Sequence, residues 1–185
     1  TLGLRSVYTA TDRNKLILEM HYISEDRRGG NAFDLQPHEA DICESARHNI
    51  TGGGLQWRHY SADNQSYFNV YASGQYTDRN SYYGAGKDPN AYGHTTDVNV
   101  VGGAQWTANL NLGLPSYFTA GAEYQINHLK DGMPGYNRLI DQQVEIAGFF
   151  AQNEWRYSNW SFTAGARADK HNLLHEVVIS PRAIL

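Results

Sequence analysis

The chain has 185 residues and a formal net charge of −4 at pH 7, and it contains no block of like charges, so a nucleic-acid-binding protein is not expected. Hydrophobic residues make up 41% and charged residues 18% of the sequence, a balance that excludes an intrinsically disordered chain. Its 13 tyrosines and 18 glycines against 5 prolines favour strands and tight turns over helices.

Alternation of apolar and polar residues, which is typical of half-buried strands, is the dominant pattern along the chain. It is clear at residues 15–22, 66–78, 117–128 and 159–169. Weaker segments over 1–10, 49–61, 96–109, 142–157 and 177–185 bring the expected number of strands to about nine. No run of about 18 apolar residues occurs, so a transmembrane helix is not expected, whereas a transmembrane strand needs only about 10 residues.

The sequence predicts connections that alternate strictly between short and long. Short polar turns are expected at 11–14, 63–66, near 110–116 and near 157–159, and long irregular stretches at 24–48, 79–95, 129–141 and 170–176. Outer-membrane barrels have short turns on the periplasmic side and long loops outside. The pattern therefore predicts an all-β, up-and-down antiparallel meander that is part of a transmembrane β-barrel.

One face of the expected sheet should contact lipid. Its members are Phe68, Val70, Ala72, Tyr76, Phe118, Ala120, Ala122, Tyr124, Ile126, Phe162, Ala164 and Ala166. Arginine is expected to be costly at Ala122 and nearly neutral at Glu123, on the other face. Aromatic residues near strand ends suit the membrane interface, and these are Tyr8, Tyr22, Tyr67, Tyr117, Trp155 and Trp160.

A soluble alternative stays open, because polar side chains in mid-strand also suit the wet face of an antiparallel sheet. It is a β-rich binding module, possibly for carbohydrate, that uses exposed Trp and Tyr. Strand length separates the two readings. An odd number of long strands cannot close as an ordinary bacterial barrel, so we expect the chain to be part of a longer polypeptide.

Three motifs near the C-terminus occur in a fixed order. Residues 148–155 read GFFAQNEW, residues 162–169 read FTAGARAD and residues 179–182 read ISPR. This order resembles the F-A-Q-x-E-W, G-x-R-x-D, S-P-R run of TonB-dependent receptor barrels. Residues 27–31 (RRGGN), 37–42 (PHEADI) and 134–138 (PGYNR) resemble loops of such receptors from the Bacteroidetes.

The resemblance implies a barrel of about 22 strands filled by an N-terminal plug. Such a receptor of the bacterial outer membrane imports a scarce nutrient such as a ferric siderophore, haem, cobalamin or a glycan. Residues 1–185 would be the partial barrel, with the plug, its TonB-contacting segment (the TonB box) and the barrel closure absent. The implied partners are the TonB complex, through the missing plug region, a nutrient chelate and outer-membrane lipid.

Candidate ligand-binding residues lie in the long connections, on the assumption that these face outward. They are Arg27, Arg28, Arg79, Tyr82, Tyr83, Tyr92, His94, Tyr136 and Arg138. Guanidinium and phenol groups suit an anionic or aromatic-rich chelate. For each residue taken singly, an ordinary solvated loop residue is the alternative.

Other motifs indicate structure more than chemistry. His38 and Glu39 lack the second histidine of a zincin site, because position 42 is Ile, so Pro37 is expected to open a short helix confined to residues 36–48. Residues 84–87 (GAGK) lack the other positions of a phosphate loop. The triplet 52–54 (GGG) predicts a bulge or a close approach of another backbone. With the single cysteine Cys43 and no catalytic grouping, we expect no metal site, cofactor or enzyme activity.

Overall fold

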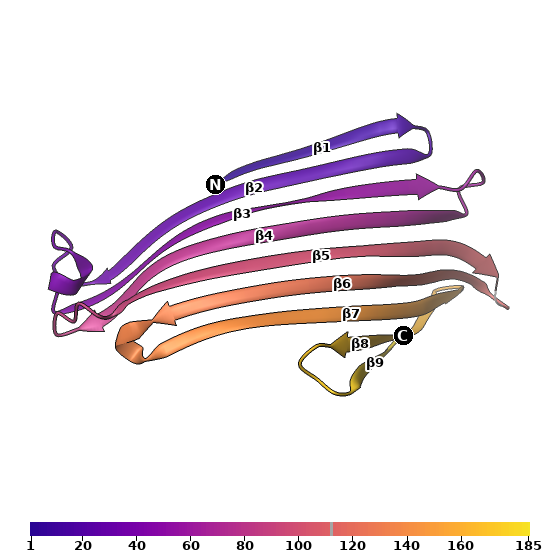
Figure 1. Ribbon diagram of the computed structural model, residues 1–185. Coiled ribbons are helices and arrows are strands. Elements are labelled where there is room, and N and C mark those ends of the chain that lie inside the picture. Colours follow the sequence, from indigo (N-terminus) through magenta and orange to yellow (C-terminus); the bar gives the residue numbers. More distant parts are fainter. Residues whose placement is uncertain (112) are drawn as a thin grey trace.

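The computed structural model describes residues 1–111 and 113–185, and its strands form one antiparallel sheet (Figure 1). The strands are β1 (Leu2–Thr11), β2 (Asn14–Gly30), β3 (Ile42–Tyr60), β4 (Ser66–Ala85), β5 (Tyr92–Asn111), β6 (Pro115–Met133), β7 (Arg138–Tyr157), β8 (Trp160–His171) and β9 (Val177–Ile184). Each strand pairs with its neighbours in the sequence, in the order β1 to β9. The predicted up-and-down meander is confirmed, and the sheet is open.

Helical structure is limited to two short 3-10 turns in the described residues, η1 (Pro37–Glu39) and η2 (Pro134–Tyr136). Pro37 does open η1, where the Glu39 carboxylate accepts a hydrogen bond from the Gln36 N–H at 2.9 Å. The predicted confinement of helix to residues 36–48 is wrong, because η2 lies outside that stretch. No helix in the described part of the chain has the length and hydropathy to cross a membrane.

The strands are longer than the sequence pattern indicates. Strands β3 to β7 have 19 or 20 residues each, about 60 Å at about 3.3 Å per residue. The connections are therefore only 31–41, 86–91, 134–137 and 172–176 at one end of the sheet, and 12–13, 61–65 and 158–159 at the other. The expected turn near 110–116 includes residue 112, which lies outside the described residues.

Strict alternation of short and long connections is thus wrong, since the connection 61–65 is longer than 134–137. The predicted strand ends mark the points at which apolar and polar residues cease to alternate, and the strands themselves continue beyond them. In β4, for example, polar residues run consecutively from Thr77 to Ser81 although the strand continues to Ala85. Consecutive polar residues in a strand place polar groups on both faces, as expected where water reaches both faces. We call the end of the sheet with the connections 31–41, 86–91, 134–137 and 172–176 the outer end. The opposite end, with the connections 12–13, 61–65 and 158–159, is the turn end.

The pairing separates an apolar face from a polar face. The whole expected lipid-facing set lies on the apolar face, since Val70 pairs with Ala104 and Ala104 with Ala122. Near the turn end this face carries aromatic pairs between neighbouring strands: Trp57–Phe68 at 6.4 Å, Trp106–Phe118 at 6.0 Å and Trp155–Phe162 at 5.7 Å between ring centroids. Of the expected interfacial aromatics, Tyr67 and Tyr117 lie instead on the polar face, beneath the guanidinium groups of Arg58 and Arg156.

A second line of aromatics crosses the apolar face farther from the turn end, and consists of Tyr22, Tyr76 and Tyr124. In β4 the two lines are separated by the residues between Phe68 and Tyr76, about 26 Å along the strand. Outer-membrane barrels have an apolar band about 25 Å tall between two aromatic girdles. The apolar face therefore fits a lipid belt in the half of the sheet nearer the turn end.

The three consecutive glycines of β3 do not form a bulge. Pairing with β2 and β4 continues through them without a shift. A Cβ at Gly53 would lie 2.5 Å from the carbonyl oxygen of Glu19, and one at Gly52 would lie 2.7 Å from the His21 ring. The close approach comes from the adjacent strand β2 itself, so these positions need glycine where the sheet curves.

Arginine on the apolar face should destabilise the folded protein, because a cation at the bilayer midplane costs about 2–4 kcal/mol. We expect this cost for Ala72→Arg and Ala122→Arg, measured as the free energy of unfolding of the full-length protein in lipid vesicles. The matched control is Gln75→Arg, which is exposed on the polar face of the strand that carries Ala72 and should cost less than about 1 kcal/mol.

Glu123 is not the neutral control that the sequence pattern predicted, because its carboxylate accepts hydrogen bonds from Tyr71 and Arg167. Equal costs at Ala72 and Gln75 would mean that the two faces are assigned wrongly.

Candidate functional site

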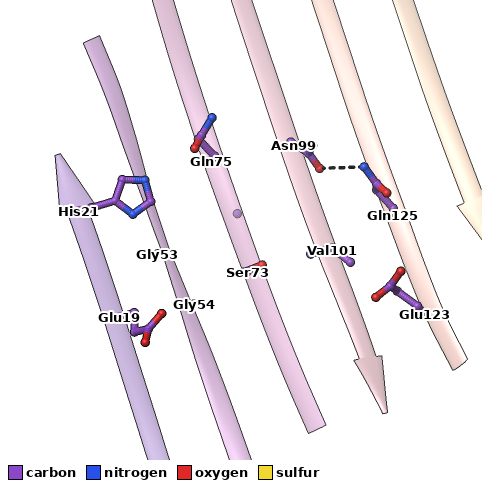
Figure 2. Close-up of a pocket in the computed structure, with 11 residues that line it drawn as sticks. Glu19, His21, Gly53, Gly54, Ser73, Gln75, Asn99, Val101, Glu123 and Gln125 are labelled. Atoms are coloured by element: carbon purple, nitrogen blue, oxygen red, sulfur yellow. Dashed lines mark hydrogen bonds between the residues drawn. The ribbon is translucent and has the colours of Figure 1, made fainter. Parts of the chain in front are cut away.

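The polar face contains a hollow in its middle (Figure 2). It has a volume of about 530 Å³ and is lined by Glu19, His21, Gly53, Gly54, Ser73, Gly74, Gln75, Asn99, Val101, Glu123 and Gln125. Glycine and serine on β3 and β4 keep its floor low, and longer polar side chains stand around it. The Gln125 amide donates to Asn99 Oδ1 at 3.3 Å. Carboxamides both donate and accept hydrogen bonds, so the side of the hollow formed by Gln75, Asn99 and Gln125 is polar but uncharged.

Beside the hollow, a polar network crosses from β4 to β8. The Tyr71 hydroxyl donates to Glu123 Oε2 at 2.6 Å, and Arg167 donates to Glu123 Oε1 at 3.2 Å and to Asp169 at 2.8 Å. In the intervening strands β5 and β7, the paired positions are Gly103 and Gly148. Because these residues have no side chain, groups on alternate strands can reach each other. Arg167 offsets only one of the two carboxylates, so this network carries one uncompensated negative charge.

The outer end of the polar face holds the most buried charge. Asp131 on β6 is only 7% exposed. Its Oδ1 accepts hydrogen bonds from the Thr95 hydroxyl at 2.5 Å and from Arg79 Nη2 at 3.4 Å, and its Oδ2 contacts Arg138 Nε at 2.7 Å. Burial raises the pKa of this carboxyl, but the Thr95 hydrogen bond and the two arginines outweigh burial, so the pKa lies below its ordinary value. We call Arg79, Asp131 and Arg138 the arginine–aspartate triad; it carries one uncompensated positive charge.

The structure separates the nine candidate ligand-binding residues by face. Arg79 and Arg138 meet at Asp131, and Arg27 and Tyr83 lie on the same polar face. Arg27 pairs with Glu25 at 3.3 Å. All nine except Tyr136 lie in strands, so their expected placement in loops is wrong. The outer strand ends were read as loops because they lack alternation.

The remaining candidates are turned away from the polar face or take part in packing. Arg28 donates to the Ala32 carbonyl at 3.1 Å, on the opposite side of β2 from Arg27. His94 Nδ1 lies 3.1 Å from Asn80 Oδ1, also on the opposite face. Tyr92 packs edge-on against Tyr82, with ring centroids 4.8 Å apart. These residues have structural contacts and do not face the triad.

Tyr82 is the largest fully buried side chain, at 1% exposure, and it organises the outer connections. It packs in a small core with Ala40, Cys43 and Ala91, and its hydroxyl donates to the Asp88 carbonyl at 3.0 Å. A buried tyrosine in this position joins the connection 31–41 to the connection 86–91. It cannot meet a ligand directly.

Further contacts extend this assembly, which we call the outer rim (residues 31–41, 86–91 and 134–137). The Gly86 N–H donates to the Asp41 carbonyl at 2.7 Å, and the Gly135 N–H donates to the Asn90 carbonyl at 3.0 Å. His38 Nδ1 lies 2.9 Å from the Tyr92 hydroxyl. The three connections are thus held together as one unit, and in the described residues no three His, Cys, Asp or Glu side chains gather at one point.

Sequence reasoning missed Asp131 and Thr95, which organise the triad. Thr95 pairs with Arg79 in one direction and with Asp131 in the other. This relation depends on the register in which the three consecutive strands β4, β5 and β6 pair. In the sequence, Asp131 lies in the stretch 129–141, which was expected to be an irregular connection, so nothing local indicated that it faces Arg79.

Replacing Tyr82 by alanine should loosen the whole outer rim, because removing a buried aromatic ring costs about 3–5 kcal/mol. Amide hydrogen exchange in the full-length protein should rise in all three connections together. In Tyr92→Phe the ring stays and only the bond to His38 is lost, at about 0.5–1.5 kcal/mol, so its effect should be much smaller. Faster exchange confined to residues 86–91 in Tyr82→Ala would contradict a single unit.

Structural neighbours agree with the fold. The siderophore receptor PirA from Pseudomonas aeruginosa superposes with a TM-score of 0.70 at 16% identity, over 98% of this chain and 29% of that one. The outer membrane transporter YddB from Escherichia coli gives 0.72 at 11%, over 96% and 28%. The ferric citrate transporter FecA, in its unliganded form, gives 0.58 at 14%, over 98% and 32%. At these identities the likeness shows the fold alone, and the chain spans less than a third of each relative.

A search of curated proteins gave no match. A family model does match, over residues 6–183, and it describes the β-barrel of TonB dependent receptor-like proteins. This covers nearly the whole sheet, including the lipid belt and the triad. The chain therefore belongs to the TonB-dependent receptor family, as a part of its outer-membrane β-barrel.

Proposed function

We propose that the chain forms part of the wall of a receptor that takes up a scarce nutrient, a ferric siderophore or similar ferric chelate, with energy from the TonB complex. The observation that carries this proposal is the position of the arginine–aspartate triad. It lies on the polar face and beyond the lipid belt, where a ligand outside the membrane first meets the barrel wall. Haem and cobalamin are the competing cargoes.

The named cargoes of the neighbours support a ferric chelate. One neighbour is named a ferric citrate transporter, and another is the ferric preacinetobactin receptor BauA from Acinetobacter baumannii. No neighbour named here is described as a receptor for haem or cobalamin. The TonB complex would act on a plug region outside residues 1–185, and this chain would bind and guide the ligand without bond chemistry.

Among the nine candidate residues, the polar-face group Arg27, Arg79, Tyr83 and Arg138 is the proposed ligand contact. Arg27 is neutralised by Glu25, whereas Arg79 and Arg138 share one carboxylate. The single uncompensated charge favours an anionic group, and the planar guanidinium suits a carboxylate or catecholate oxygen pair. Arg28, Tyr82, Tyr92, His94 and Tyr136 support this wall from the other face and from the outer rim.

A soluble carbohydrate-binding module is disfavoured by the apolar face. Met20, Leu55, Tyr76, Val100 and Phe149 are all exposed there, across neighbouring strands. A contiguous apolar surface of this kind belongs against lipid or another protein. Strands of 19 and 20 residues also exceed what a small sandwich needs.

The double substitution Arg79→Ala and Arg138→Ala should weaken binding of the ferric chelate by roughly 10- to 100-fold, because hydrogen bonds to charged groups contribute about 1.5–3 kcal/mol. Binding to the full receptor and cellular iron uptake would be measured with a panel of ferric siderophores, haem and cobalamin. The control is Arg28→Ala on the opposite face, with unchanged binding expected. Unaltered binding of every panel member by the double variant would remove the triad from the ligand site.

Ligand affinity should be constant from about pH 5 to pH 8 and should fall in more acid solution. The pKa of Asp131 is lowered in the folded protein, so the anchoring of both arginines is fully present above the ordinary carboxyl pKa of 3.8 and is lost as pH falls through the lower folded value. Titration of binding to the receptor in detergent tests this. A transition near pH 6 would instead point to a histidine.

A further inference from the structure

Strand β7 has a free edge at the outer end of the sheet. It pairs with β6 from Arg138 onward, but its pairing with β8 begins only at Ile146. Figure 1 shows β7 running well past the end of β8 and the connection that follows it. The segment 138–145 is therefore flanked by a strand on one side only.

Asn172, the residue after β8, closes the lower part of this edge. Its backbone N–H donates to the Glu145 carbonyl at 3.0 Å, its Oδ1 accepts from the Glu145 N–H at 2.9 Å, and its Nδ2 donates to the Gln143 carbonyl at 3.0 Å. The carboxamide thus replaces one residue of a neighbouring strand. The same contacts fix the direction of the backbone groups: those of Gln143 and Glu145 point to the free edge, so by alternation those of Asp141 and Leu139 do as well.

Nothing within the described residues covers this upper part. Leu139 is 87% exposed, no proline interrupts the segment, and pairing with β6 shows no bulge. The Asp141 carboxylate points to β6, where it contacts His128 at 2.7 Å and Lys130 at 3.7 Å. Proteins ordinarily protect an exposed edge with proline, bulges or charges, or by covering it. The edge at Leu139 and Asp141 has neither a proline nor a bulge. Its one charge, the Asp141 carboxylate, contacts β6 and so does not protect the edge.

We propose that this edge receives an extended segment from another outer connection of the same receptor polypeptide, outside residues 1–185. The free N–H and C=O groups of Leu139 and Asp141 recognise a backbone in the strand conformation, whatever its sequence. This chain spans only 28% to 35% of the length of the neighbours named above, so a receptor of their length has further outer connections to supply one. The vacant place lies one strand spacing, about 4.8 Å, from β7, directly beyond the connection 172–176.

The first test is residue-resolved amide exchange in the purified full receptor. Ile140 and Gln142 bond to β6 and serve as internal controls within the same strand. We expect the amides of Leu139 and Asp141 to be protected to within about tenfold of these controls, because an added strand would satisfy them. Exchange of Leu139 and Asp141 at the rate of an unstructured peptide would overturn the proposal.

The second test identifies the source of the segment. A photo-reactive amino acid at Leu139 in the purified receptor should form an intrachain cross-link to a segment outside residues 1–185. The control position is Asn80, which is exposed at the outer end of β4 but has strands on both sides, and no such cross-link is expected there. Cross-links that form only with a second protein in whole membranes, or with a second receptor copy, would also overturn the assignment. Neither test depends on which ligand the receptor carries.

Discussion

Backbone N–H and C=O groups find no water in the lipid layer, so each must have a partner within the protein. The sheet meets this constraint by pairing consecutive strands continuously through the lipid belt. Between β3 and β4, for example, pairing runs without a shift from Ile42 and Ala85 to Tyr60 and Tyr67. Unbroken pairing forces strict alternation of side chains between the two faces, and the faces can then differ completely in polarity.

Curvature of the sheet has to be achieved without breaking that pairing. Glycines allow this where a Cβ would meet a neighbouring carbonyl, as at Gly53, and they also make room for large side chains on the polar face. A Cβ at Gly103 would lie 2.7 Å from the Tyr71 ring, and one at Gly121 would lie 2.6 Å from the Phe150 ring. An aromatic side chain on one strand thus covers the bare backbone of the next, which pins the pairing of the two strands.

How far the sequence predicts this structure depends on the environment of each half-strand. Where lipid lies on one face, alternation is strong, and segments such as 66–78 and 117–128 were placed correctly with the right face outward. Beyond the lipid belt both faces carry polar groups, so Arg79 and Asp131 could not be recognised as strand residues. The triad escaped prediction for a further reason, since it depends on pairing across β4, β5, β6 and β7, which no local pattern encodes.

The same loss of alternation explains why polar-face residues and packing residues lie so close together at the outer end. Tyr82 and Tyr83 are consecutive residues of β4 on opposite faces: the first is buried in the core of the outer rim, and the second lies on the polar face. The phenol of Tyr136 donates to the carbonyl of Tyr83, so η2 is tied to the strand that also carries Arg79. Arg138 lies two residues after η2 and forms an ion pair with Asp131, so the rim contacts fix where β7 begins and hence where this guanidinium meets the carboxylate. The geometry of the triad is therefore set by packing in the outer rim.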